Sequence, residues 1–267
     1  MEQIVQDASL KLIDDFVAEG RQHFTFQQAQ QKLGLSRSAA SNLLRRMRET
    51  GLIDRVRYGR YAIRKFGVLG TPSAAEDIAL AVGAAFSGVP HRMAYRTALD
   101  EHDLITHPAR TIQVATASQI RATSLSSMPL RLVREPEASV LIGAFAYGES
   151  WLSDIERALL DAAARPKLVG GLTTLAEAIV AAASEVDVKK MTDHAKALGW
   201  EQAIRRIGSI ADALEIGNLA GQLKPIGPIT ADLDMEPGTR GARAWRDSAW
   251  HMRWPIEVSE LANVVNR

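Results

Sequence analysis

The chain has 267 residues, of which 46% are hydrophobic and 24% charged, a composition typical of a soluble globular protein with room for two domains. It contains no cysteine, which excludes a disulfide framework and any zinc site with cysteine ligands. The N-terminus lacks a basic stretch followed by an apolar run, and no segment approaches the ~18 consecutive apolar residues of a membrane span. The sequence therefore predicts a cytoplasmic protein with no signal peptide and no membrane contact.

A net charge of +1 conceals a strongly basic N-terminal region. Residues 1–70 carry 12 Lys and Arg against 7 Asp and Glu, whereas the remainder carries 20 against 24. Within residues 32–65 the balance is 10 basic against 2 acidic. Such a local excess is expected of a module that binds a polyanion, although a solvated basic surface without a partner would have the same charge.

Two helices and a glycine turn are predicted first. Residues 9–18 have helical periodicity, with Leu10, Ile13 and Val17 on one face and Leu12 and Phe16 adjoining it. Thr25 and Gln28 have the spacing of a capping box, which predicts the start of a second helix that runs to about residue 32. Gly34 then supplies the positive φ that a tight turn into a further helix requires.

A third helix is predicted from its N-cap Ser36 to about Thr50. Four apolar residues at helical spacing form one buried stripe, namely Ala40, Leu43, Leu44 and Met47. The other face carries only Ser, Asn and Arg, namely Arg37, Ser38, Ser41, Asn42, Arg45 and Arg46. Arginine binds guanine bidentately, asparagine binds adenine, and serine binds base edges or phosphate. This face therefore has the chemistry to read a major groove.

Residues 52–63 alternate like two short strands around Tyr58 and Gly59. Such a hairpin after a helix-turn-helix is a wing, with Arg57 and Arg60 near its tip, where they reach phosphates or the minor groove. We therefore predict a winged helix-turn-helix DNA-binding domain over residues 1–68. A winged helix used for protein contacts is the alternative, and the basic excess favours DNA.

A second domain is predicted over residues 72–267, after a segment with two glycines and a proline. Helices are expected at 74–86 and 93–104, and strands at 111–116, 130–133 and 140–147. Four more helices follow between residues 154 and 215, and a tail rich in Pro, Gly and Trp after Lys224 is expected to be irregular. The predicted fold class is α+β: a winged helix-turn-helix plus a larger mixed α/β domain with a small sheet followed by helices.

No motif of an enzyme stands out. Gly170 and Gly171 lack the lysine of a phosphate-binding loop, and no Gly-x-Ser-x-Gly elbow is present. His102 and His107 are five residues apart, on different helix faces, and Asp232 and Asp234 lie beside a Pro-Gly turn. We therefore predict no catalytic residue, no metal and no cofactor, and interpret the pair Arg205 and Arg206 as solvated helix surface rather than a partner interface.

Two segments carry a resemblance to a known family. Residues 91–104, HRMAYRTALDEHDL, resemble a short helix of AbiE-type antitoxins, and residues 155–161, IERALLD, resemble their Glu-Arg-Thr-Leu-Leu-Asp stretch, here with Ala158 in place of Thr. The following Arg165-Pro166 and the Gly-Gly-Leu of 170–172 fit the same pattern. The residues themselves suggest a simpler structural role, because Arg157 and Asp161 are spaced to pair along one helix.

The resemblance covers about residues 1–215 and implies a bacterial regulator of a toxin–antitoxin or phage-defence system. Its expected partners are double-stranded DNA of its own promoter, which it represses, and a nucleotidyltransferase-like toxin. The alternative is a winged-helix transcription factor whose C-terminal domain senses a small molecule. An enzyme with a DNA-targeting domain is a third possibility, for which no cluster of titratable residues is evident in the sequence.

Overall fold

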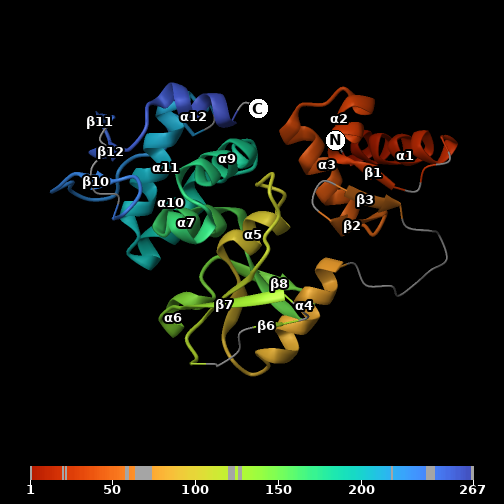
Figure 1. The fold of residues 1–267 in the computed structure, drawn as a ribbon, viewed down its shortest axis with the longest axis horizontal. Helices are drawn as coiled ribbons and strands as arrows, with labels where there is room; N and C mark the ends of the chain where they lie inside the picture. Colours follow the sequence, from red (N-terminus) through yellow and green to blue (C-terminus); the bar gives the residue numbers. More distant parts are fainter. Residues whose placement is uncertain are drawn as a thin grey trace.

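The computed structural model describes residues 2–19, 21, 23–57, 60–63, 74–119, 124–125, 128–217, 219–238 and 244–265. The fold is α+β, as predicted. Two separate hydrophobic cores form, one from residues between 12 and 63 and one from residues between 79 and 265. We call these parts the N-terminal module and the C-terminal module; they lie side by side in Figure 1. The predicted boundary at residues 68–72 lies outside the described residues.

The N-terminal module has three helices and a three-stranded sheet. Its elements are α1 (Glu2–Ala18), β1 (His23–Thr25), α2 (Phe26–Leu33), α3 (Arg37–Glu49), β2 (Ile53–Arg57) and β3 (Arg60–Ile63). The three predicted helices are confirmed, and the strand order is β1-β3-β2 with antiparallel pairing throughout. The short strand β1 was not predicted, because three residues between two helices give no measurable alternation.

The local chemistry of the helix-turn-helix is as the sequence indicates. The Thr25 hydroxyl accepts from the Gln28 amide at 3.2 Å, and the Gln28 side chain accepts from the Thr25 amide at 2.8 Å, so the capping box is complete. Gly34 ends α2 with φ at 60°, in the left-handed region. The Ser36 hydroxyl then accepts from the Ala39 amide at 3.3 Å and caps α3.

The apolar face of α1 differs from the prediction in part. Leu10 and Val17 are 43% and 56% exposed, whereas Leu12, Ile13 and Phe16 are buried. Phe16 stacks on Phe24 of β1 with ring centroids 4.6 Å apart. The face of α1 that is buried is therefore the one that packs against the unpredicted strand β1.

The C-terminal module contains a six-stranded mixed sheet of order β6-β7-β5-β4-β9-β8. Its strands are β4 (His91–Met93), β5 (Ile112–Thr116), β6 (Ser124–Leu125), β7 (Met128–Arg134), β8 (Ala144–Tyr147) and β9 (Ser150–Ser153). The associated helices are α4 (Ala74–Ala85), α5 (Tyr95–Glu101) and α6 (Glu137–Val140). The segment predicted as a helix over 93–104 thus begins with the end of a strand, and the strand predicted over 140–147 begins in a helix.

The helices predicted between 154 and 215 are confirmed as α7 (Ile155–Ala164), α9 (Leu172–Ala182), α10 (Val188–Leu198) and α11 (Glu201–Ala213), with the short α8 (Pro166–Val169) between the first two. Helix α5 contacts both β5 and α7, so it links the sheet to this helical layer. Figure 1 shows the layer stacked above the sheet, with α9 nearest to α3 of the N-terminal module.

The tail is more regular than predicted. It forms β10 (Leu233–Asp234), β11 (Trp245–Asp247), β12 (Met252–Trp254) and α12 (Val258–Val265), and a small sheet of order β10-β12-β11 packs on α11. Trp254 donates to the Ser209 hydroxyl at 2.9 Å, and Trp250 lies so close to Gly208 that a Cβ there would clash with its ring. A glycine on α11 is therefore what lets this indole dock.

The predicted solvation of Arg205 and Arg206 is wrong. Both side chains are largely buried and donate to backbone carbonyls of the tail: Arg205 to Trp250 at 2.9 Å, and Arg206 to Asp234 at 3.2 Å. Burial, with little compensating negative charge, lowers the pKa of Arg206 to about 10. These arginines attach the tail to α11.

A buried charge cluster joins the sheet to α7. Arg92 of β4 bonds Glu135 and Asp161 at 2.8 Å each, and Arg157 bonds the same two carboxylates at 2.8 Å each. All four side chains are at most 1% exposed, and the Tyr95 hydroxyl donates to Glu135 at 2.9 Å. Burial alone would raise the pKa of Asp161, but the two guanidinium groups outweigh it and hold that pKa below its ordinary value. We call these four residues, Arg92, Glu135, Arg157 and Asp161, the buried quartet.

We predict that Arg157→Ala destabilises the protein by about 3–5 kcal/mol, because it leaves two buried carboxylates with a single guanidinium. Lys189→Ala is the matched control, since Lys189 pairs with Asp193 at the same i,i+4 spacing but is 86% exposed. Denaturant unfolding of both variants measures the difference. Equal stability of the two variants would contradict a structural role for the quartet.

Candidate nucleic-acid interface

Helix α3 carries most of the predicted DNA-binding residues. Its buried side contains Ala40, Leu43, Leu44 and Met47, as predicted. Ser36 caps the helix and its hydroxyl lies 3.1 Å from that of Ser38, whereas Arg46 is exposed. Ser41 differs from the prediction, because it is only 7% exposed and belongs to the buried side of the helix.

The polar face of α3 is directed at the C-terminal module. Arg37 pairs with Glu177 of α9 at 3.4 Å, and Arg45 pairs with Glu185, just beyond α9, at 2.8 Å. With its amide nitrogen turned toward Glu185, Asn42 also donates to that carboxylate. Three of the predicted DNA-binding residues therefore contact carboxylates of the same chain.

Arg48, on the same face, was not among the predicted site residues. It donates to Asp103 at 3.2 Å and to Glu101 at 3.4 Å, and its side chain is 13% exposed. Tyr147 of β8 donates to Glu101 at 2.8 Å, which fixes this carboxylate from the opposite side. The spacing of Arg48 from Arg37 and Arg45 along a helix could be recognised in the sequence. Its acidic partners could not, because they lie more than 50 residues away in the chain.

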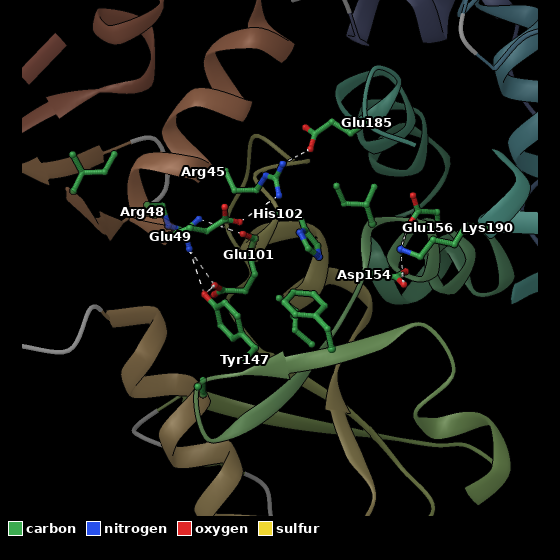
Figure 2. A pocket seen from close by; sticks show the side chains of 16 residues that line it. Arg45, Arg48, Glu49, Glu101, His102, Tyr147, Asp154, Glu156, Glu185 and Lys190 are labelled. Atoms are coloured by element: carbon green, nitrogen blue, oxygen red, sulfur yellow. Dashed lines mark hydrogen bonds and ion pairs between the residues drawn. The ribbon is translucent and has the colours of Figure 1, made fainter. Parts of the chain in front are cut away.

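A cavity of about 530 Å³ opens between the two modules beside these pairs. Figure 2 shows Arg45 and Arg48 entering it from α3, and Lys190 of α10 held between Glu156 and Asp154 at its far side. Apolar side chains complete the wall, namely Ile53, Ala79, Phe145, Leu152 and Ile155. Both modules therefore contribute to one cavity with mixed polar and apolar lining.

Two ionisable groups in this wall have shifted pKa values. Burial raises the pKa of Glu185, against the opposing effect of the nearby Arg45. Burial also lowers the pKa of His102, which lies 2.6 Å from the Ser153 carbonyl through Nε2. The imidazole is therefore neutral at physiological pH, with Nε2 as the donor.

The predicted wing is only partly visible. Strands β2 and β3 pair antiparallel, with Arg57 opposite Arg60. The tip at Tyr58 and Gly59 lies outside the described residues, as do the side chains of the two arginines. A role for Arg57 and Arg60 in DNA contact stays a prediction.

The described part of the chain contains no group of three or more His, Asp or Glu side chains placed to hold a metal ion. Asp232 and Asp234 pair instead with Arg246 and Arg253, each at 2.7 Å. Within the same residues, no helix combines the length and hydropathy needed to span a bilayer.

Part of the N-terminal module matches a known protein family. Residues 11–64 match the family described as "Transcriptional regulator, AbiEi antitoxin". The match agrees with the predicted resemblance over the helix-turn-helix, whereas the two motifs that carried the resemblance, residues 91–104 and 155–161, lie outside the matched segment. No curated protein matches the sequence.

Almost the whole chain resembles a solved structure described as the crystal structure of the RV2827C protein from Mycobacterium tuberculosis. The match has a TM-score of 0.53 at 13% identity and covers 98% of this chain and 95% of that one. At this identity the likeness shows a shared fold alone. It extends over both modules, beyond the segment matched by the AbiEi family.

We predict that the protein loses stability as the pH falls below about 6.5, in part because of His102. The unfolded chain binds a proton below that pH, whereas the folded protein, in which the pKa of His102 is lowered, excludes it. The contribution of His102 to the free energy of unfolding is therefore fully present above pH 6.5. Below that pH it decreases by at most about 1.4 kcal/mol per pH unit.

Thermal unfolding of His102→Gln between pH 7.5 and 5 measures this effect and should show a shallower dependence than the unmodified protein. His107→Gln is the control, because His107 is exposed. An unchanged pH dependence in His102→Gln would contradict the prediction.

Proposed function

We propose that the protein is a transcriptional regulator that binds double-stranded DNA at the promoter of its own operon. The observation that carries the proposal is the capped α2–Gly34–α3 turn, with its Ser, Asn and Arg face, inside the segment that matches a family of transcriptional regulators. In this arrangement α3 is the recognition helix and enters the major groove.

The residue types assign roles along α3. Arg45 and Arg46 bind guanine edges or phosphates, and Asn42 binds adenine. Ser36 and Ser38 lie at the N-terminus of α3, where hydroxyl and amide donors suit a phosphate. Arg57 and Arg60 of the wing contact phosphates or the minor groove, and Arg37 adds to the phosphate contacts.

The second part of the proposal is that the protein acts as the antitoxin of a toxin–antitoxin pair. It rests on the description of the matched family and on the resemblance of residues 91–104 and 155–161 to such antitoxins. The C-terminal module would neutralise a nucleotidyltransferase-like toxin encoded beside it. This makes the protein a regulator rather than an enzyme, acting in the cytoplasm.

A second candidate function is supported by the cavity between the modules. A transcription factor that senses a small molecule needs a pocket coupled to its DNA-binding helix, and this cavity is lined by Arg45 of α3 together with Glu185 and Lys190 of the C-terminal module. A ligand of this site would change the melting temperature and the DNA affinity together, whereas toxin neutralisation requires no such ligand.

We predict that the triple variant Arg45→Ala, Arg46→Ala, Arg60→Ala loses at least about 100-fold in affinity for the DNA upstream of its own gene, because it removes base and phosphate contacts together. Fluorescence anisotropy with a labelled promoter duplex and an unrelated duplex measures affinity and base preference at one salt concentration.

The control replaces three basic residues remote from α3, Lys189, Lys196 and Lys224, with alanine and lowers the net charge equally. It should retain promoter preference. Unchanged promoter affinity in the arginine variant would refute the proposed mode of DNA binding.

A further inference from the structure

The helix face proposed to read DNA is the face that contacts the C-terminal module. Arg37, Arg45 and Arg48 lie at i, i+8 and i+11 along α3, which places them on one side of the helix. Each pairs with carboxylates of the C-terminal module, at distances of 2.8 to 3.4 Å. Figure 2 shows Arg45 and Arg48 turned toward these carboxylates rather than away from the protein.

Four acidic side chains receive these arginines, namely Glu101, Asp103, Glu177 and Glu185. They come from three separate places in the chain: the end of α5, α9 and the residues after α9. A row of carboxylates that neutralises the arginines of a recognition helix has the charge and hydrogen-bonding capacity of a DNA backbone. The same arginines cannot contact these carboxylates and DNA phosphates at once.

The contact is less complete than the buried quartet. Arg45 uses both terminal nitrogens, with Glu49 at 3.3 Å and Glu185 at 2.8 Å, but its Nε is buried without a hydrogen-bond partner. Burial raises the pKa of Glu185, which indicates that its charged form is incompletely compensated. Arg37 is 40% exposed, so its pair with Glu177 is partly open to water. The pairs of Arg37 and Arg45 are therefore weak enough to be exchanged for pairs with another polyanion.

We infer that the structure is an autoinhibited state, in which the acidic row Glu101, Asp103, Glu177 and Glu185 holds α3 in place of DNA. The inference rests on the proposed function of α3 in DNA binding. The DNA-binding form arises when the N-terminal module separates from the acidic row. The apparent DNA affinity is then the affinity of the open form multiplied by the fraction of molecules that are open.

Autoinhibition of this kind also changes the salt dependence of DNA binding. An arginine that leaves a carboxylate for a phosphate loses an attraction that salt weakens as well, so its net contribution to the salt dependence is small. Once the carboxylate is neutralised, the same arginine contributes its full share, roughly 0.9 in the slope of log K against log salt concentration.

The test neutralises two members of the row with Glu177→Gln and Glu185→Gln in the full chain. Glutamine has the shape of glutamate and keeps an oxygen that can accept from the Thr106 amide, as Glu177 does at 2.6 Å. The matched control is Glu19→Gln with Glu49→Gln, which adds the same charge to the N-terminal module but removes no pair between the modules. We expect the test variant to bind promoter DNA about tenfold more tightly than the control, with a slope steeper by about 1 to 2.

A second measurement reports the separation without DNA. Because the chain has no cysteine, Lys11→Cys on α1 and Lys189→Cys on α10 accept spin labels at these two exposed positions alone. Double electron–electron resonance should show one distance population in the labelled protein and an added, longer population when Glu177→Gln and Glu185→Gln are present. The Glu19→Gln, Glu49→Gln control should show the single population.

The outcomes separate the two proposals. If the protein binds its promoter and the arginine variant does not, but the test variant binds no better than its control and shows no longer distance, DNA binding stands and autoinhibition is overturned. If neither the protein nor the test variant binds promoter DNA, both proposals fail. A tenfold gain in affinity accompanied by the longer distance supports autoinhibition.

Discussion

The C-terminal module depends on a pair of arginines that share a pair of carboxylates out of contact with water. Moving four charges into an apolar interior is expensive, and it is tolerable here because the quartet has no net charge and each member bonds two others. Arg92 belongs to the sheet, Glu135 follows its strand β7, and Arg157 and Asp161 belong to α7. The quartet therefore fixes the position of the helical layer on the sheet, and with it the position of the acidic row that meets α3.

The contact between the modules uses the same chemistry under different conditions. Its arginines come from α3 and its carboxylates from the C-terminal module; Arg48 is only 13% exposed, but Arg37 and Glu177 keep access to water, at 40% and 15% exposure. Ion pairs in such surroundings are worth little individually and respond to salt. One protein thus uses arginine–carboxylate pairs both to build a rigid interior and to form an interface that can be exchanged.

Local signals in the sequence predicted the N-terminal module well. The capping box at Thr25, the turn at Gly34 and the cap at Ser36 act over three or four residues, so the sequence alone specifies them. Arg157 and Asp161 could likewise be paired from their spacing, but the two partners that bury them, Arg92 and Glu135, are brought in by the sheet. The strands β4 and β9 were missed because each has three or four residues beside a helix, too few for alternation to register.

The contact between α3 and the C-terminal module was not predicted, for a related reason. The polar face of α3 was recognisable from helical spacing, but the sequence gives no means of pairing Arg45 with a glutamate 140 residues away. The tail shows the opposite error: Pro and Gly suggested an irregular strap, yet Trp250 and Trp254 anchor a small sheet on α11. Burial of large side chains overrode the local preference for turns.

The distribution of tryptophan has a spectroscopic consequence. All five tryptophans lie between residues 151 and 254, in the C-terminal part of the chain, and the first 73 residues contain none. Intrinsic fluorescence at tryptophan wavelengths therefore reports on the C-terminal module alone, whereas far-ultraviolet circular dichroism follows the helices of both modules. Because the two cores are separate, the two signals together reveal whether the protein loses its structure in one cooperative step or in two.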